Sequence, residues 1–259
     1  MAVLFGDADW TVQLPSTKPL PQFLLEEEIP LLHLYHQAMK SGAQLVRCPT
    51  GKTSFSWLEP LGLAEKIEAV HNVAVQSAKH TQAQGNFDLL VAGVIGPRPQ
   101  TAPYANERAL EREVSEPAIY LIDKGVDCLL TQGFEDLNTL EIALRAIKDV
   151  NRVPVPVSVF FRPGPELQGV LTRLFALGEV MGFEAVGLEL PLSQVARIRK
   201  SDLATDLAFG LQILPEPTGA VLDEPRALEA LWQLEPTLLL GGEGLGPQAW
   251  EELKQKLGA

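Results

Sequence analysis

The chain has 259 residues, of which 46% are hydrophobic and 21% charged, and its formal net charge is −12 at pH 7. This composition is typical of a globular domain that buries a sizeable core. The surplus of acidic residues argues against nucleic acid and against an anionic membrane as partners, because both would repel the chain. No apolar stretch approaches the roughly 20 residues that a membrane helix needs. With two cysteines and no leader pattern, we expect a soluble cytoplasmic protein.

Short β-type runs alternate with amphipathic helical patterns along the whole chain. The predicted strands are Ala2–Phe5, Gln44–Cys48, Leu89–Val94, Cys128–Gln132, Pro156–Phe160, Ala185–Glu189, Phe209–Ile213 and Thr237–Leu240. The predicted helices are Pro30–Ser41, Ala64–Thr81, Glu107–Lys124, Leu137–Lys148, Glu166–Met181, Leu192–Lys200, Glu224–Gln233 and Pro247–Leu257. Nearly continuous Val, Leu, Ile and Ala runs are typical of parallel strands covered on both faces. The sequence therefore predicts one α/β domain over residues 1–259, a single (β/α)8 TIM barrel.

A glycine-rich turn near the C-terminus indicates which end of the barrel carries the site. Thr237–Leu240 has the pattern of a buried strand, four glycines lie within Gly241–Gly246, and Pro247 can begin a helix. Strand-to-helix connections of this kind form the functional face of such barrels. Two other connections on that face, Gly6–Ile29 and Gly96–Asn106, are long and rich in proline, and would act either as lids or as rigid covers.

Five segments, in the right order and spacing, carry a family resemblance. They are His36–Val46, Gly62–Val75, Val91-Ala-Gly-Val-Ile-Gly-Pro97, Lys124–Leu137 and Gly241-Gly242. The third is close to a "vaGsiGP" motif and is the most specific of the five. Together they resemble the homocysteine S-methyltransferase family, zinc-thiolate barrels that include the homocysteine domain of cobalamin-dependent methionine synthase. The resemblance implies a TIM barrel and zinc-dependent methyl transfer to homocysteine.

The departures from the family pattern fall at the site. The family's zinc is held by one cysteine in a "vNC" motif and two in "GGCCG", and here Leu190, Glu243 and Gly244 stand at those positions. Leucine and glycine carry no donor side chain, whereas zinc of this kind takes thiolates. Cys48 and Cys128 are expected at opposite ends of the barrel. We therefore expect no cofactor, and zinc in particular is not expected.

Charged and polar residues nevertheless gather at the predicted mouth. In strand order they are Asp7, Asp9, Arg47, Arg98, Gln132, Arg162, Glu189, Glu216 and Glu243. We expect the acidic residues Asp7, Glu189, Glu216 and Glu243 on one side and the three arginines across from them. Such a mouth would bind an amino-acid-like zwitterion, or chelate a hard cation such as Mg²⁺. The plainer alternative is a rim of solvated charges, some of them paired with one another.

The sequence leaves three hypotheses for function. The first is a pseudoenzyme: a divergent barrel that binds a small amino-acid-like ligand or serves as a non-catalytic partner subunit in methionine and one-carbon metabolism. The resemblance suggests methylenetetrahydrofolate reductase or a cobalamin or folate module as partner. The second is an enzyme with a repurposed carboxylate-rich site, and the third a residual homocysteine S-methyltransferase. No catalytic residue is assigned; the candidate ligand-binding residues are Asp7, Arg47, Gln132, Arg162, Glu189, Glu216 and Glu243.

Overall fold

A computed structural model describes residues 3–14, 17–102, 106–164, 167–203, 207–217 and 224–258. Its eight parallel strands lie in the order β1-β8-β7-β6-β5-β4-β3-β2. They are β1 Leu4–Phe5, β2 Leu45–Cys48, β3 Leu90–Ile95, β4 Cys128–Thr131, β5 Val157–Phe161, β6 Ala185–Pro191, β7 Ala208–Leu214 and β8 Leu238–Gly241. A parallel bridge between Gly6 and Leu45 joins the remaining pair, β1 and β2, and closes the ring. The predicted TIM barrel is confirmed.

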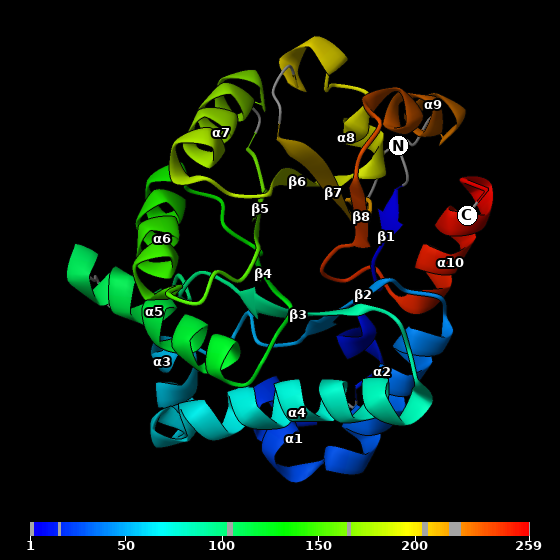
Figure 1. Ribbon diagram of the computed structural model, residues 1–259. Helices are drawn as coiled ribbons and strands as arrows, with labels where there is room; N and C mark the ends of the chain where they lie inside the picture. The colour runs from blue at the N-terminus through cyan, green and yellow to red at the C-terminus, as the bar shows by residue number, and fades with distance from the viewer. Residues whose placement is uncertain are drawn as a thin grey trace.

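Helices surround this ring of strands (Figure 1). They are α1 Leu20–Glu26, α2 Glu28–Lys40, α3 Phe55–Leu58, α4 Ile67–Gly85, α5 Glu107–Asp123, α6 Leu137–Val150, α7 Leu167–Met181, α8 Leu192–Val195, α9 Glu224–Leu234 and α10 Pro247–Lys256. Short 3₁₀ turns are η1 Trp10–Gln13, η2 Glu59–Leu61, η3 Ala64–Lys66 and η4 Lys200–Leu203. Among these described helices, none combines the length and the apolar character needed to cross a membrane.

Two predicted boundaries around the sixth strand are wrong. The strand β6 continues past Glu189 to Pro191, and α8 ends at Val195 instead of continuing to Lys200. The carboxylate of Asp202 accepts a hydrogen bond from the backbone N–H of Arg199 at 3.3 Å. Such local side-chain bonds compete with helical ones, and here a 3₁₀ turn forms in place of a longer helix. At the N-terminus, Ala2 of the first predicted strand lies outside the described residues.

The interior of the barrel is a separate apolar cluster from the larger core between strands and helices. It contains Leu45, Ala92, Cys128, Leu130, Phe160, Leu238 and Leu240. Phe160 occupies space that Gly187 and Gly210 leave open, since a Cβ on either glycine would lie under 3.0 Å from its ring. The glycines of β6 and β7 are therefore required by the aromatic side chain that faces them from β5.

The same alternation determines which side chains reach the mouth. Successive residues of a strand point to opposite faces, so the residues two positions after the interior cluster face inward as well. Two positions after Leu45, Leu130, Phe160, Gly187 and Gly210 in the sequence are Arg47, Gln132, Arg162, Glu189 and Gln212. Apolar layers thus give way to a polar layer at the carboxyl end of the strands.

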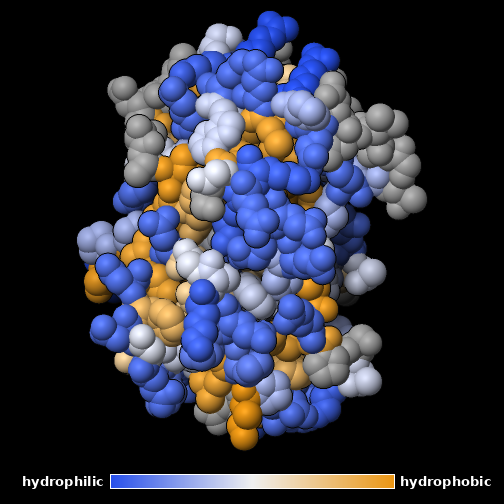
Figure 2. Space-filling view, turned by 90° about the vertical axis from the view of Figure 1, so that its right-hand side faces the viewer, coloured by the Kyte–Doolittle hydropathy of each residue, from blue (hydrophilic) through white to orange (hydrophobic). Residues whose placement is uncertain are grey.

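Figure 2 shows the face of the molecule that lies on the right in Figure 1. The centre of this face is mainly hydrophilic, and its apolar side chains lie in separate groups between the hydrophilic ones. The described chain exposes several large apolar side chains, among them Ile29, Val153, Val180 and Trp232. They come from different elements of the barrel, and single exposed apolar residues are ordinary on a protein surface.

Substitution of Gly187 by alanine tests the packing of the barrel interior. The new Cβ would lie 2.6 Å from the Gly210 carbonyl oxygen and 2.6 Å from the Phe160 ring. We expect Gly187→Ala to lower the free energy of unfolding by about 1–3 kcal/mol, the usual cost of overpacking. Gly169→Ala is the control, because Gly169 is exposed on α7 with nothing within 4 Å of an added Cβ. Urea unfolding curves should show that control unchanged or stabilised, and equal midpoints for both variants would contradict the packing argument.

Candidate functional site

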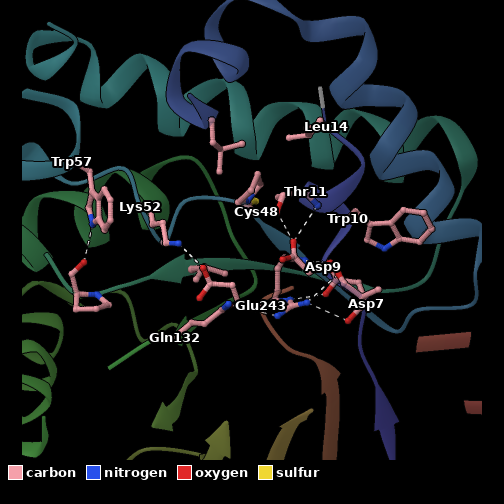
Figure 3. Close-up of a pocket in the computed structure, with 18 of the residues that line it drawn as sticks. Asp7, Asp9, Trp10, Thr11, Leu14, Cys48, Lys52, Trp57, Gln132 and Glu243 are labelled. Carbon is pink, nitrogen blue, oxygen red and sulfur yellow. Dashed lines mark hydrogen bonds and ion pairs between the residues drawn. The ribbon is translucent and has the colours of Figure 1, made fainter. Parts of the chain in front are cut away.

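A cavity of about 660 Å³ opens at the carboxyl ends of the strands. This size lies within the range of about 300–1,000 Å³ that holds small-molecule ligands. It is lined by residues at or after the ends of β1 to β5 and β8, by η1, and by one face of α2. Figure 3 shows the labelled side chains of this cavity, including Asp7, Lys52, Gln132 and Glu243.

Asp7 and Arg47 form a buried ion pair at the seam between β1 and β2. Arg47 Nε donates to Asp7 Oδ1 at 2.7 Å, and the Arg47 backbone N–H donates to Asp7 Oδ2 at 3.0 Å. Arg47 Nη2 also donates to the carbonyls of Ala8 at 3.0 Å and Gly241 at 2.6 Å. Burial raises the pKa of the Asp7 carboxyl, and Arg47 partly offsets that effect. Most donors of Arg47 are thus engaged with backbone and Asp7, while Nη1 reaches the Gln132 amide oxygen at 3.4 Å.

Arg162 is the centre of a second charge cluster. Its Nη2 donates to Glu189 Oε2 at 3.0 Å and to Glu243 Oε2 at 3.2 Å, and its Nη1 lies 3.6 Å from Glu135. Glu189 is fully buried, and its other oxygen accepts the Gly133 N–H at 2.5 Å. Burial raises the pKa of Glu189, against the opposing effects of Arg162 and Gly133.

Glu243 is held by cations from two sides of the mouth. Lys52, in the loop after β2, pairs with Glu243 Oε1, and Arg162 on the β5 side pairs with Oε2. Burial acts to raise the pKa of Glu243, but the two cations outweigh it and lower that pKa. Lys52 also lies 5.8 Å from the centroid of the Trp57 ring, whose Nε1 donates to the Pro97 carbonyl at 2.9 Å. The loop that presents Lys52 is therefore fastened to the connection after β3.

The expected separation of acidic and basic side chains is wrong. Asp7 contacts Arg47 and Glu189 contacts Arg162 because these pairs come from neighbouring strands, β1 with β2 and β5 with β6. Glu243, after β8, reaches Arg162 across the mouth. Glu216 lies elsewhere: it accepts from the Ser193 N–H at 2.9 Å and from Ser193 Oγ at 2.5 Å, beside α8. Of the seven candidate residues, the cavity is lined by Asp7, Arg47, Gln132, Arg162 and Glu243.

The side chains at the mouth do not fit a thiolate zinc site. Leu190 is packed in the cluster between strands and helices, Glu243 is ion-paired, and Gly244 has no side chain. The thiol of Cys48 lies on the outer side of β2, 3.7 Å from the Ala74 carbonyl, while Cys128 belongs to the barrel interior. Burial raises the pKa of both cysteines to about 12, which disfavours the thiolate. Within the described ranges, no three His, Cys, Asp or Glu residues are grouped as metal ligands.

The cavity residues Lys52 and Trp10 were missed in the sequence, as was Gln212, a buried neighbour of Glu189. Lys52 and Trp10 lie in connections after strands β2 and β1, where no motif distinguishes them. Gln212 has a recognisable signal in the pattern: it is a polar residue inside an otherwise apolar strand, at the inward-facing position. It is fully buried beside Glu189, and neither Nε2 nor Oε1 has a hydrogen-bond partner among the described residues.

The buried carboxyl of Glu189 predicts a pH effect on stability. Because its pKa is raised on folding above the ordinary value of 4.5, the folded state holds this proton more tightly than the unfolded state. Any stability from this group is therefore present at low pH and is lost as pH rises from 4.5 through the raised pKa. We expect the wild type to lose stability relative to Glu189→Gln over that window, measured by urea unfolding at a series of pH values. A difference between the two proteins that stays constant with pH would contradict the raised pKa.

The family model and the curated relatives indicate the same family. The family model described as "Homocysteine S-methyltransferase" matches residues 9–188. Betaine–homocysteine S-methyltransferase 1 of Danio rerio is 23% identical over 194 residues, which cover 73% of this chain and 48% of that protein. The Xenopus laevis protein of the same name is 27% identical over 154 residues, 58% of this chain and 38% of the relative. The chain thus spans about half or less of the length of these curated relatives.

The fold has a close structural counterpart. The metallated form of the homocysteine methyltransferase MmuM from Escherichia coli superposes with a TM-score of 0.74 and 15% identity, covering 99% of this chain and 96% of that one. At this identity the likeness concerns the fold alone. The match of the family model, which covers more than half of the chain, is the finding that identifies the family. This chain belongs to the homocysteine S-methyltransferase family.

Proposed function

We propose that this barrel binds a small amino-acid-like zwitterion at its mouth as a pseudoenzyme, without zinc-thiolate methyl transfer. The observation that carries the proposal is the position of Glu243, whose carboxylate lies between Lys52 and Arg162. That arrangement is a cradle for a carboxylate group. By the sequence resemblance, Leu190, Glu243 and Gly244 stand where the family has its zinc cysteines, which is why zinc-thiolate chemistry is left out of the proposal.

Glu243 itself indicates what the cradle accepts. A ligand carboxylate can take its place on Lys52 and Arg162, two cations that lie at the cavity wall. Arg162 Nε is buried and has no hydrogen-bond partner among the described residues, so this guanidinium is not fully satisfied within the protein. Glu243, once released from the cations, would accept the ligand's ammonium group. The cavity therefore supplies a group of each sign for a zwitterion.

Zinc activation of a thiol does not enter this proposal, because the donor set does not fit the ion. A carboxylate cage for a hard cation is also disfavoured. Glu189 and Glu243 both pair with Arg162, and a divalent cation would have to displace that guanidinium, while Glu216 is engaged by Ser193. A residual homocysteine S-methyltransferase remains the hypothesis with least support.

An acid–base enzyme is the second candidate, and one observation favours it. Glu189 has a raised pKa close to the cavity, and such carboxyls can hold and release a proton during catalysis. Glu189, however, is not among the described residues that line the cavity. Its carboxylate is hydrogen-bonded to the Gly133 N–H and to Arg162, which both line the cavity. We therefore place this candidate second.

A partner from one-carbon metabolism, methylenetetrahydrofolate reductase or a cobalamin or folate module, is part of the same proposal. So is a cytoplasmic location. Family membership supports the partner, and the sequence pattern with only two cysteines supports the location. Co-purification from the source cells would test the partner.

Calorimetric titration with L-homocysteine, with and without added zinc, tests the proposed function. We expect the same binding in both conditions and in the presence of a chelator. Lys52→Met should weaken binding about tenfold, the effect of losing a hydrogen bond to a charged group. Lys52 is about half exposed, so this change should leave the fold intact. Lys200→Met is the matched control, because Lys200 pairs with Glu235 at the surface.

Three results would overturn the proposal. Binding that requires zinc would return the methyltransferase hypothesis to first place. Binding that is equal for wild type and Lys52→Met would remove the carboxylate cradle, and with it the assigned role of Glu243. Methyl transfer to homocysteine by the purified chain would overturn the pseudoenzyme hypothesis directly.

A further inference from the structure

The cavity has a second, apolar arm that the charged mouth does not use. It runs between η1, α2 and the outer side of β2, and is lined by Leu14, Leu31, Leu34, Ala38, Val46 and Cys48. In Figure 3, Leu14 and Cys48 lie above the row formed by Asp9, Asp7 and Glu243. The polar and apolar walls belong to one continuous cavity.

The cavity as a whole is too large to be a packing defect. Protein interiors are packed about as densely as organic crystals and leave few voids larger than a water molecule. The whole cavity measures about 660 Å³, and a small amino acid seated on Lys52 and Arg162 would leave its apolar arm unfilled. Water is a poor occupant of an arm lined by such side chains.

The polar atoms along the arm are mostly neutral or already engaged. Burial raises the pKa of Cys48 to about 12, so that its thiol behaves as a small apolar group. The Tyr35 hydroxyl donates to the Ala74 carbonyl at 2.9 Å. Trp10 lines the cavity, and its Nε1 is buried without a hydrogen-bond partner in the described chain. The arm therefore suits a hydrocarbon or thioether chain.

We propose that the ligand is an α-amino acid with a long apolar side chain, its charged head on Lys52 and Arg162 and its side chain in the arm between η1, α2 and β2. This inference rests on the proposed zwitterion site and adds the class of side chain. Selectivity comes from apolar burial: each further methylene group that enters the arm should tighten binding about fourfold.

The test is a titration series of L-alanine, L-2-aminobutyrate, L-norvaline and L-norleucine, which differ by single methylene groups, with L-homoserine as the polar comparison. We expect affinity to rise along the series by about fourfold per methylene group, and homoserine to bind no better than alanine. Tryptophan fluorescence offers a second readout, because Trp10 and Trp57 both line the cavity.

Variants of residues in the arm test whether the gain in affinity along the series arises there. Ala38→Leu places extra side-chain volume in the arm and should abolish the advantage of norleucine over alanine while alanine binding stays unchanged. Leu34→Ser makes the arm polar and should reduce the same advantage severalfold. Leu32→Ser is the matched control on α2, since Leu32 is also half-buried but does not line the cavity.

The outcomes separate the two proposals. A rising series that becomes flat in Ala38→Leu and Leu34→Ser, but not in Leu32→Ser, supports the inference. A flat series in the wild type, with binding still weakened by Lys52→Met, overturns the apolar arm and leaves the zwitterion site standing. No binding of any amino acid in the series or of L-homocysteine overturns both.

Discussion

The guanidinium of Arg47 holds the seam on which the barrel and its mouth depend. The strand β1 has only two residues, and one bridge from Gly6 to Leu45 joins it to β2. Arg47 spans this weak place: it binds the Asp7 carboxylate and the Ala8 carbonyl on one side, and the Gly241 carbonyl at the end of β8. Buried charges are costly unless they are paired and hydrogen-bonded, and here nearly every donor is used.

The polar layer at the mouth has two parts with different roles, one around Arg47 and one around Arg162. Around Arg47 the contacts are buried and largely satisfied within the protein, which suits a structural element. Around Arg162 they are less complete: its Nε and the whole Gln212 amide have no partner among the described residues. Glu243 and Lys52 are also partly exposed there. Binding sites are drawn from such incompletely satisfied groups, because a ligand can supply the missing contacts.

The chain keeps the barrel of the homocysteine S-methyltransferase family, and the mouth of that barrel is lined by paired charges. A barrel separates these two properties, since its interior layers stabilise the fold and the strand-to-helix loops carry the site. Here Phe160, with Gly187 and Gly210 opposite, fills the interior independently of the side chains at the carboxyl ends of the strands. Leu190, near the end of β6, belongs to the core between strands and helices, where its side chain stabilises the packing.

The sequence by itself determined the barrel, its eight strands and the family, because apolar runs, helical periodicity and glycine turns are local patterns. It also determined that Leu190 and Gly244 supply no metal donor, which depends on residue type alone. Only the tertiary structure decided which charges meet. Arg47 with Asp7, Arg162 with Glu189 and Lys52 with Glu243 are pairs between distant segments. The apolar arm could not be predicted from the sequence either, because a cavity is formed by the spacing of several packed elements and not by any one of them.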